Sequence, residues 1–481
     1  MLRYDMDARG TLSRYEYLYR RIRDDIIAGG LAPDDKLPSK RALAEAHGVS
    51  VVTAESAYAQ LVAEGYVCAR PRSGYYVAAI PLPDDVPARL LTHGPAQADE
   101  ASAAAASEEP HADVFADFSQ PATHAGASAA ELWGKSLRAA LAREPADELF
   151  AAQPQQGNVR LREAIARYLR AARGMAADAA HIVVAAGANV LYDMVALLVG
   201  SDACVALEDP GYPRLAQTYA AHGLHVAHCA LDADGIAMAD VEASGASLVH
   251  IMPSHQFPTG QPTSIARRYE LLGWAARGQG RFIVEDDYDW EFRLAGKPIP
   301  PLASIDAEGQ VIYISTFSKS LSSAVRVAFA VLPDALLARY RTACAHLGNT
   351  VSSLDQIALA RLMESGDYER HVNRYRTRSR ELRDALAGAL RSSALADGMR
   401  IEEADSGLHF VLALDAERSE TYIAERARSR GLLLAPLSGY ASCAEHAARA
   451  DGLRRFVMQY DGVEAAAIGR AVEVLEWAAG S

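Results

Sequence analysis

The sequence predicts a multidomain chain in which a small helical module with a β-hairpin precedes a large α/β domain on a mostly parallel sheet. Three observations carry this prediction. The 481 residues exceed one ordinary domain, and half of them are hydrophobic. Residues 12–65 show the hydrophobic spacing of short helices. From residue 113 onward, short apolar runs alternate with helical patterns, which is typical of a parallel sheet covered on both faces.

The first module contains three predicted helices. Residues 12–29 form the first, which a pair of glycines ends. Ser39 is a natural N-cap for the second helix, and Gly48 ends it. Ser50 caps a third helix that runs to Gly65. Two short helices joined by a tight glycine-containing turn predict a helix-turn-helix.

A β-hairpin follows these helices. Residues 66–70 and 75–77 read as its strands, with Arg70 and Arg72 at the tip. Arginines at the tip of such a wing suit contact with DNA phosphates or a groove. We therefore expect residues 1–78 to form a winged helix-turn-helix that binds DNA. A helical docking module is the alternative, because the module is nearly neutral overall.

Composition limits which other classes of protein the chain can belong to. Residues 79–112 are rich in proline, alanine, serine and acidic residues, which predicts a flexible linker. A net charge of −13 argues against a protein coated in basic surface. Five scattered cysteines without CxxC spacing favour reduced thiols over disulfides or a zinc site. We expect no metal, no membrane segment and a cytoplasmic protein.

The large domain is predicted to span residues 113–481. Its sheet is expected to have seven strands, and a smaller α+β domain is expected from residue 353 to the C-terminus. Helices are expected to begin near Ala188, Pro213, Ser264 and Ser320. The predicted strands are residues 181–186, 203–207, 224–228, 247–252, 281–285, 311–314 and 326–332.

Polar groups follow most of these strands, where open α/β sheets bind ligands. Lys319 follows the sixth strand, and a partly desolvated lysine can form a Schiff base with a carbonyl. Thr316, Ser318 and Arg326 suit a phosphate. The amides of residues 187–189 begin a helix and suit one too. With the acids at 286 and 287, this set fits pyridoxal 5′-phosphate (PLP), whose pyridinium nitrogen pairs with a carboxylate.

The N-terminal module resembles the winged helix-turn-helix of the GntR family of bacterial regulators. The resemblance rests on residues 37–44, 49–53, 57–61 and 64–66, followed by Gly74 to Val77. An arginine often follows the recognition-helix serine in that family, whereas Val51 stands here and can at most contact a thymine methyl. The resemblance implies operator DNA as a partner. It points to DNA contacts by Lys36, Ser39, Lys40, Arg41, Ser50, Thr53, Arg70, Arg72 and Gly74.

The second domain resembles the class I, fold-type I aminotransferases, most specifically in residues 316–321 with Arg326. Both domains together resemble the MocR subfamily of GntR-type regulators. That likeness implies a Schiff base between PLP and Lys319. Asp286 would pair with the pyridine nitrogen, although Asp287 remains an alternative. It also implies PLP contacts by Gly187, Ala188, Asn189, Tyr212, Tyr288, Thr316, Ser318 and Arg326, with Tyr212 stacked on the ring and Tyr288 on its phenolic oxygen.

The same resemblance implies an effector site and a head-to-tail homodimer. Arg214, His409 and Arg455 are the expected effector-binding residues, with Arg454 as the near alternative to Arg455. Two positions depart from the enzymes. Ala152 stands where a tyrosine commonly reaches the partner's phosphate, and Phe257 replaces an asparagine. We expect the loss of these two polar contacts to disfavour efficient enzymatic turnover.

Three functions remain open from the sequence. The first is a transcriptional regulator that binds PLP as a Schiff base and senses a small amino compound by external aldimine formation. The second is an active aminotransferase with an accessory N-terminal module. The third is a sensor of PLP itself that controls vitamin B6 synthesis. The effector, the operator sequence and the sign of regulation are not predicted.

Overall fold

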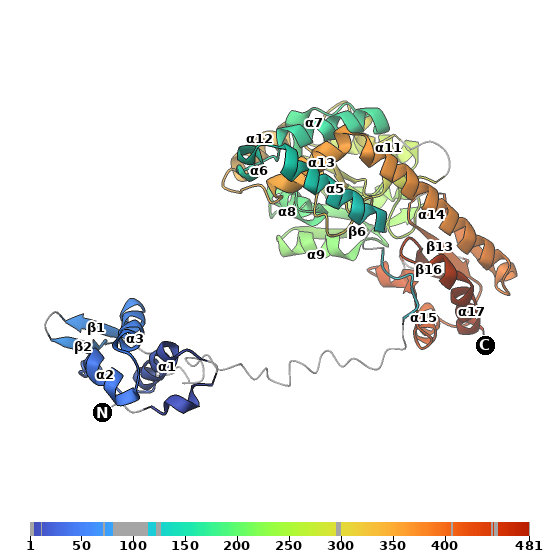
Figure 1. Cartoon of the computed structure of the whole chain (residues 1–481). Helices are drawn as coiled ribbons and strands as arrows, with labels where there is room; N and C mark the ends of the chain where they lie inside the picture. Colours follow the sequence, from blue (N-terminus) through green and yellow to red (C-terminus); the bar gives the residue numbers. More distant parts are fainter. Residues whose placement is uncertain are drawn as a thin grey trace. The chain divides into compact units, whose positions relative to one another are not determined.

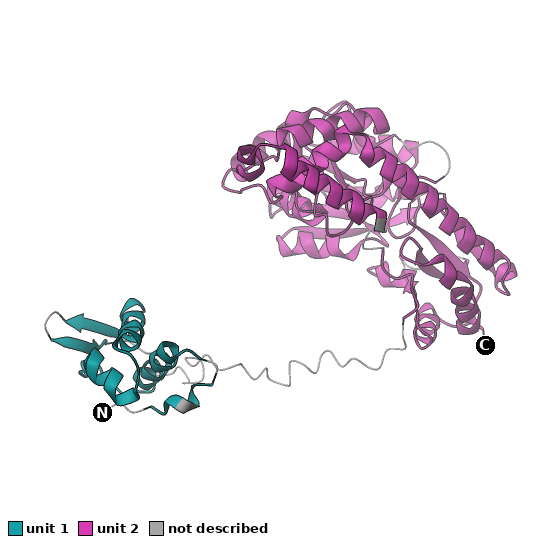
Figure 2. Ribbon diagram, viewed as in Figure 1, with its two compact units in different colours: residues 1–109 teal, residues 110–481 magenta. Residues whose placement is uncertain are grey.

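The computed structural model describes residues 4–480 except 11, 71–72, 80–113, 122–126, 295–299, 406, 444–445 and 447–450 (Figure 1). The chain divides into two compact units, residues 1–109 and 110–481 (Figure 2). The predicted linker, apart from Ala79, lies outside the described residues, and so does Arg72. Among the described helices, none combines the length and the apolar character that crossing a membrane requires.

The first unit is a helix-turn-helix with a hairpin wing, as predicted. Ser39 and Ser50 cap the second and third helices, and each side chain accepts a backbone N–H three residues on. Leu43, Tyr58 and Leu61 are fully buried between the helices. The elements are α1 (Arg14–Ile27), α2 (Lys40–His47), α3 (Val51–Ala63), β1 (Val67–Arg70) and β2 (Gly74–Val77).

The second unit contains an eight-stranded sheet in the order β4-β11-β10-β9-β8-β5-β6-β7. All seven predicted strands are present, and the eighth, β7 (Gly235–Ile236), pairs antiparallel with β6 at the edge. The others are β4 (Ile182–Ala185), β5 (Cys204–Asp209), β6 (His225–Asp232), β8 (Leu248–Ile251), β9 (Phe282–Asp286), β10 (Val311–Thr316) and β11 (Ala328–Val331).

The prediction of a helix beginning near Ser320 is wrong. The chain after Ser320 forms turns until β11 begins, and no helix starts there. The reason is topological, because β11 runs antiparallel to both β10 and β4. An antiparallel neighbour can be reached without the crossover helix that a parallel strand requires.

Helices cover both faces of this sheet. Alternate residues of β5 show the division, because Val205 and Leu207 pack on one side while Ala206 packs on the other. The first side holds α8 (Ala188–Val199), α9 (Pro213–Ala221) and α12 (Asp334–Ala343). The second side holds α7 (Val159–Tyr168), α10 (Met238–Ala243), α11 (Ile265–Ala276) and α13 (Ser353–Glu364). The shorter helix α6 (Ala146–Phe150) and helix α5 (Ala127–Arg143) contact α13.

The predicted smaller α+β domain is present, but it begins later than residue 353, because α13 packs against the large sheet. A four-stranded sheet has the order β12-β13-β16-β15 and packs against α14, α15 and α17. A short strand from the start of the unit, β3 (Ala116–Asp117), pairs with β14 (Leu432–Leu433). The elements are α14 (Asp367–Arg391), β12 (Met399–Glu402), β13 (His409–Leu414), α15 (Glu420–Arg428), β15 (Ala435–Pro436), β16 (Arg454–Gln459) and α17 (Ile468–Ala479).

Candidate functional site

The expected cofactor residues lie where the parallel strands of the large sheet have their carboxyl ends. Asp286 and Thr316 end the parallel neighbours β9 and β10, and Lys319 follows three residues later. Arg326 precedes β11, which runs the opposite way, so the start of β11 meets the same edge. Because β11 is antiparallel, its beginning lies beside the carboxyl end of β10, and Arg326 is therefore placed next to the residues that follow β10.

Lys319 is half-buried in a turn of hydroxyl residues. Its Nζ lies 6.0 Å from the centre of the Tyr288 ring. Thr316 Oγ1 accepts the Ser318 N–H at 3.1 Å and donates to Ser318 Oγ at 3.1 Å. The turn therefore holds an amine and two hydroxyls close together, beside an aromatic face.

Gly187 and Arg326 meet in a close approach at the start of α8. Gly187 has φ +96°, and a Cβ there would lie 2.3 Å from Arg326 Nη2. Its own N–H donates to the Ala185 carbonyl at 2.8 Å, so this amide is already used. The amides of Ala188 and Asn189 belong to the first turn of α8, where no intrahelical acceptor exists. Two amides and a guanidinium thus point to an anion-binding corner.

Asp286 and Asp287 have different surroundings, although both are buried. Asp286 Oδ2 accepts a hydrogen bond from the Tyr192 hydroxyl and lies 3.6 Å from His250 Nε2. Its other oxygen, Oδ1, has no hydrogen-bond partner among the described residues. Burial and the neighbouring Asp286 carboxylate raise the pKa of Tyr192, which keeps this phenol a donor.

Asp287 instead forms an ion pair with Arg173, which ends the π-helical segment Leu169–Arg173. Asp287 also accepts a hydrogen bond of 2.7 Å from Tyr313. Its charge is therefore compensated within the protein. Of the two acids, only Asp286 lacks an arginine or lysine partner among the described side chains.

A buried histidine, His255, contacts the hydroxyl group of Tyr288. His255 Nδ1 lies 2.8 Å from Asp289 Oδ2 and 3.2 Å from the Tyr288 hydroxyl. The His255 and His409 rings are 4.4 Å apart. Burial, with nearby His255 and Lys319, lowers the pKa of His409 well below its ordinary value, so His409 is neutral at physiological pH. Its Nε2 lies 3.2 Å from the Pro258 carbonyl, to which an N–H there would donate.

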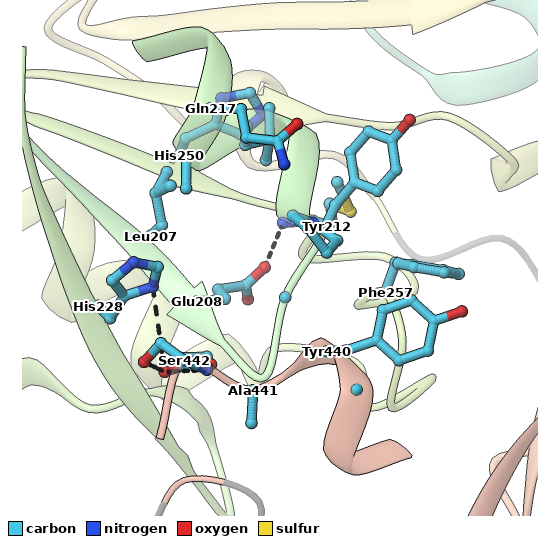
Figure 3. A pocket seen from close by; sticks show the side chains of 17 residues that line it. Leu207, Glu208, Tyr212, Gln217, His228, His250, Phe257, Tyr440, Ala441 and Ser442 are labelled. Carbon is cyan, nitrogen blue, oxygen red and sulfur yellow. Dashed lines mark hydrogen bonds and ion pairs between the residues drawn. The ribbon is translucent and has the colours of Figure 1, made fainter. Parts of the chain in front are cut away.

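A cavity of about 300 Å³ lies beside Tyr212, at the C-terminal end of β5. Figure 3 shows the rings of Tyr212, Phe257 and Tyr440 on one side of it, with Glu208 and His228 on the other. Burial raises the pKa of Glu208 to about 8, so this carboxyl is largely uncharged at neutral pH. Tyr212 is among the lining residues, whereas Lys319, Asp286, Tyr288 and Arg326 are not. The cavity is thus an aromatic-walled space next to Tyr212.

The expected effector residues lie in different environments. Arg214 is exposed in the first turn of α9, two residues after Tyr212. Arg455 is buried and donates to the carboxylates of Glu402 and Asp451 at 2.7–3.1 Å. Burial alone would lower the pKa of Arg455, but these two acids outweigh it and raise the pKa. Arg454 donates instead to the Arg418 carbonyl at 3.0 Å.

The expected DNA contacts lie in the first unit around α2, α3 and the wing. Ser39 and Ser50 are helix caps, and Thr53 follows in the first turn of α3. Lys40 pairs with Glu55, and Arg70 pairs with Asp34. Arg41 is exposed, and Lys36 Nζ lies 5.8 Å from the Tyr76 ring centre. Gly74 has φ +120° and begins β2.

Several side chains at the site were not singled out from the sequence. Tyr192 lies among mostly apolar residues of α8, where a tyrosine usually indicates core packing. Arg173 lies more than 100 residues from Asp287. His255 carried a weak signal, because it belongs to the polar run that follows β8. Tertiary contacts alone bring these residues together.

These residues fit PLP. The lone Asp286 Oδ1 suits a protonated pyridine nitrogen, and the Gly187–Arg326 corner suits a phosphate. Lys319 supplies the amine, and the rings of Tyr288 and Tyr212 supply aromatic faces. Similar donor sets on strand ends hold this cofactor in enzymes that use it as an electron sink.

Comparisons with known proteins divide the chain in the same way. Residues 14–77 match the family of bacterial regulatory proteins called the gntR family, and residues 128–448 match aminotransferase class I and II. The multiple substrate aminotransferase of Thermococcus profundus has a TM-score of 0.66 at 21% identity, covering 81% of this chain and 96% of that one. A kynurenine aminotransferase of Pyrococcus horikoshii also has a TM-score of 0.66, at 19% identity, covering 82% and 98%. These two show the fold of the second unit.

Curated relatives span both units. The HTH-type transcriptional regulator YhdI of Bacillus subtilis is 34% identical over 90% of each chain. A probable rhizopine catabolism regulatory protein, MocR of Rhizobium meliloti, is 32% identical over 91% of this chain and 89% of its own. The pyridoxine biosynthesis transcriptional regulator PdxR of Corynebacterium glutamicum is 29% identical over 88% of each. This chain therefore belongs to the MocR subfamily of GntR-type transcriptional regulators, which join a DNA-binding module to an aminotransferase-like domain.

Proposed function

We propose that this transcriptional regulator binds PLP through Lys319 and changes its DNA binding when a small amino compound replaces the lysine on the cofactor. The observation that carries the proposal is the buried Asp286 carboxylate at the end of β9, next to the strand that precedes Lys319. Asp286 and Asp287 each have an Oδ1 without a partner among the described residues, but only Asp287 is paired with an arginine. PLP would supply an aldehyde that exchanges between amines. The regulator's own residues would hold it and recognise the amine.

The assignment of roles follows the local chemistry. Asp286 would pair with the pyridine nitrogen, because Arg173 already compensates Asp287. Thr316, Ser318, Arg326 and the amides at 188 and 189 would hold the phosphate. Tyr212 would stack on the ring, and Tyr288 would donate to its phenolic oxygen.

Arg214 and His409 are the proposed effector contacts, since Arg214 follows Tyr212 by two residues and His409 lies near enough to Lys319 for that amine to help lower its pKa. Arg455 would serve only after exchanging Glu402 or Asp451 for an effector carboxylate. We further propose a head-to-tail homodimer, because a regulator that moves two DNA-binding modules needs two linked domains. An effector can shift DNA binding only by its differential affinity for the two states.

An absorbance titration tests the cofactor site. Purified protein with added PLP should show the band of a lysine-bound cofactor, and one amine from a panel should shift it. Lys319→Ala should lose the band with PLP alone. A band that persists in Lys319→Ala would place the attachment elsewhere and contradict the proposal.

A second candidate is a sensor of PLP itself. The relative PdxR is named as a pyridoxine biosynthesis regulator, which favours this alternative. It predicts that PLP alone changes operator binding and that no amine in the panel adds a further change. A third, sustained turnover as an aminotransferase, predicts continuous formation of a keto product from an amino donor.

A further inference from the structure

The recognition helix α3 begins with two exposed valines. Val51 is 43% exposed and Val52 is 69% exposed. The buried side of the helix consists of Ala54, Ala57, Tyr58 and Leu61, which face the core of the module. Helical spacing at 100° per residue places Val52 on the side opposite these residues. The start of α3 therefore presents methyl groups to solvent.

Ser50, Thr53 and Glu55, which lie close to the two valines in the sequence, are engaged within the module, whereas Ser56 is exposed one turn after Val52. Ser50 Oγ accepts the Thr53 N–H at 3.0 Å and lies 2.8 Å from Thr53 Oγ1. Glu55, one turn on, pairs with Lys40 of α2. Residues 51–59 contain no arginine, lysine, asparagine or glutamine. The first two turns of α3 thus lack the side chains that bind guanine or adenine edges in a bidentate manner.

Exposed cationic residues occur on other elements of the same module. Arg41 is exposed on α2, and Lys36 and Arg70 lie against Tyr76 beside the wing. Such residues position a protein on the phosphate backbone without reading sequence. The N-terminal residues of a recognition helix contact base edges in the major groove. In that groove, the one apolar group that a base edge offers to a valine is the thymine C5-methyl.

We infer that Val51 and Val52 read thymine methyl groups, so that each operator half-site carries thymine where the start of α3 enters the major groove. The inference rests on the membership of the DNA-binding family and not on the proposed cofactor chemistry. The ligand class is a duplex with adjacent or near-adjacent thymines, recognised by apolar contact instead of bidentate hydrogen bonds.

The experiment starts from random duplex DNA. The full-length protein is used to select bound sequences, and the selected site is then synthesised with each thymine replaced in turn by deoxyuridine. This change removes the C5-methyl and leaves the base pair intact. Burying one methyl group corresponds to about a fourfold change in affinity. Wild-type protein should therefore lose about fourfold at one or two positions per half-site.

Valine variants assign the effect to the helix. Val51→Ala and Val52→Ala should bind the thymine site more weakly and lose the sensitivity to deoxyuridine at the position that each reads. Val62→Ala is the matched control, because Val62 is 37% exposed near the other end of α3. It should keep the full sensitivity. Circular dichroism confirms that all three variants fold.

Two results would overturn the inference. One is a selected site in which no deoxyuridine substitution weakens binding by wild-type protein. The other is a sensitivity to deoxyuridine that Val51→Ala, Val52→Ala and the double variant all retain. Failure to select any DNA would instead count against DNA binding by this chain.

Discussion

Arg173 and Asp287 form an ion pair in which each side chain is only 1% exposed. Asp287 is adjacent to Asp286 in the sequence, yet the two carboxylates have different partners. Asp287 is held by a guanidinium and by Tyr313, whereas Asp286 is met by Tyr192 and, at 3.6 Å, by His250. One acid is part of the protein's internal charge balance, and the other remains available to a ligand.

This difference predicts distinct phenotypes for two similar substitutions. Asp287→Asn removes the carboxylate that pairs with the buried Arg173, which should destabilise the fold by about 3 kcal/mol. Asp286→Asn should change unfolding little, because an amide oxygen can still accept from Tyr192. It should weaken PLP retention roughly ten- to hundredfold, as expected for loss of a hydrogen bond to a charged group.

Denaturant unfolding of the cofactor-free proteins and equilibrium dialysis of PLP measure the two effects. Arg173→Met together with Asp287→Asn is the informative control, since it removes both charges. The double variant should recover part of the lost stability. If Asp287→Asn abolished PLP retention while leaving stability unchanged, the roles assigned to the two acids would be reversed.

The Gly187–Arg326 corner gives a second prediction with a matched control at the other end of the same helix. Gly187 has φ +96° and Gly200 has φ +95°, so alanine is strained similarly at both positions, by about 1–3 kcal/mol. At Gly187 a Cβ would also meet the Arg326 guanidinium, whereas nothing lies within 4 Å at Gly200. Gly187→Ala should therefore lose phosphate-dependent PLP binding, and Gly200→Ala should keep it.

Equal losses of PLP affinity in the two alanine variants would contradict this reading of the corner. Comparison of PLP with pyridoxal, which lacks the phosphate, sharpens the test. The Gly187→Ala variant should bind both with similar affinity, because the contribution of the phosphate is lost.

His255 gives a spectroscopic prediction on the proposed cofactor geometry. Its Nδ1 lies 2.8 Å from Asp289, so this nitrogen carries the proton, and the Tyr288 hydroxyl lies 3.2 Å from it. At 3.2 Å the Tyr288 oxygen can share this N–H with Asp289 in a three-centre hydrogen bond, which makes Tyr288 a better donor to a phenolic oxygen. His255→Phe should therefore raise the pKa of the absorbance transition of the lysine-bound cofactor.

His255→Gln keeps an N–H donor in this region and should restore the transition toward its wild-type pH. A titration of absorbance against pH measures the transition without any turnover. An unchanged transition in His255→Phe would show that His255 acts through packing alone. Gly260 and Gly407 approach its ring closely enough to make such packing strong.

Glu208 predicts a pH dependence of stability. Burial raises the pKa of Glu208 from 4.5 to about 8. The folded chain keeps a proton that the unfolded chain releases, so the contribution to stability is full below pH 4.5 and declines as the pH rises toward 8. Glu208→Gln stays uncharged at every pH. Its stability relative to wild type should therefore rise with pH.

Denaturant unfolding of wild type and Glu208→Gln at pH 5 and pH 9 makes this comparison. The relative gain at the higher pH should be a few kcal/mol at most, since each pKa unit corresponds to about 1.4 kcal/mol. A stability difference independent of pH would mean that Glu208 is ionised in the folded protein throughout this range.

The sequence was sufficient for the strands and for the residues that follow them. Short apolar runs such as Val311 to Ile314 have one interpretation when turn residues bound them, and chemistry-bearing side chains come next in the chain. The helix expected after Ser320 failed because strand direction is not encoded in a local pattern. A mostly parallel sheet favours a crossover helix between consecutive strands, but β11 runs antiparallel to both β10 and β4.

The ion-pair partners of the buried charged residues could not be predicted, because they depend on contacts between segments that are distant in the sequence. Nothing near Asp287 in the sequence indicates Arg173, and nothing near Arg455 indicates Glu402. The ambiguity between adjacent acids therefore needed the structure. The availability of Arg455 for an effector also depends on a pairing across three strands of the smaller sheet.

The central claim is that the state of the amine on Lys319 controls DNA binding. Its most direct test is the affinity of one selected operator duplex for the cofactor-free protein, the PLP form and the PLP form with the amine that shifts its spectrum. The amine should change operator affinity in wild type and should have no effect in Lys319→Ala. Identical operator affinity in all three wild-type forms would contradict it.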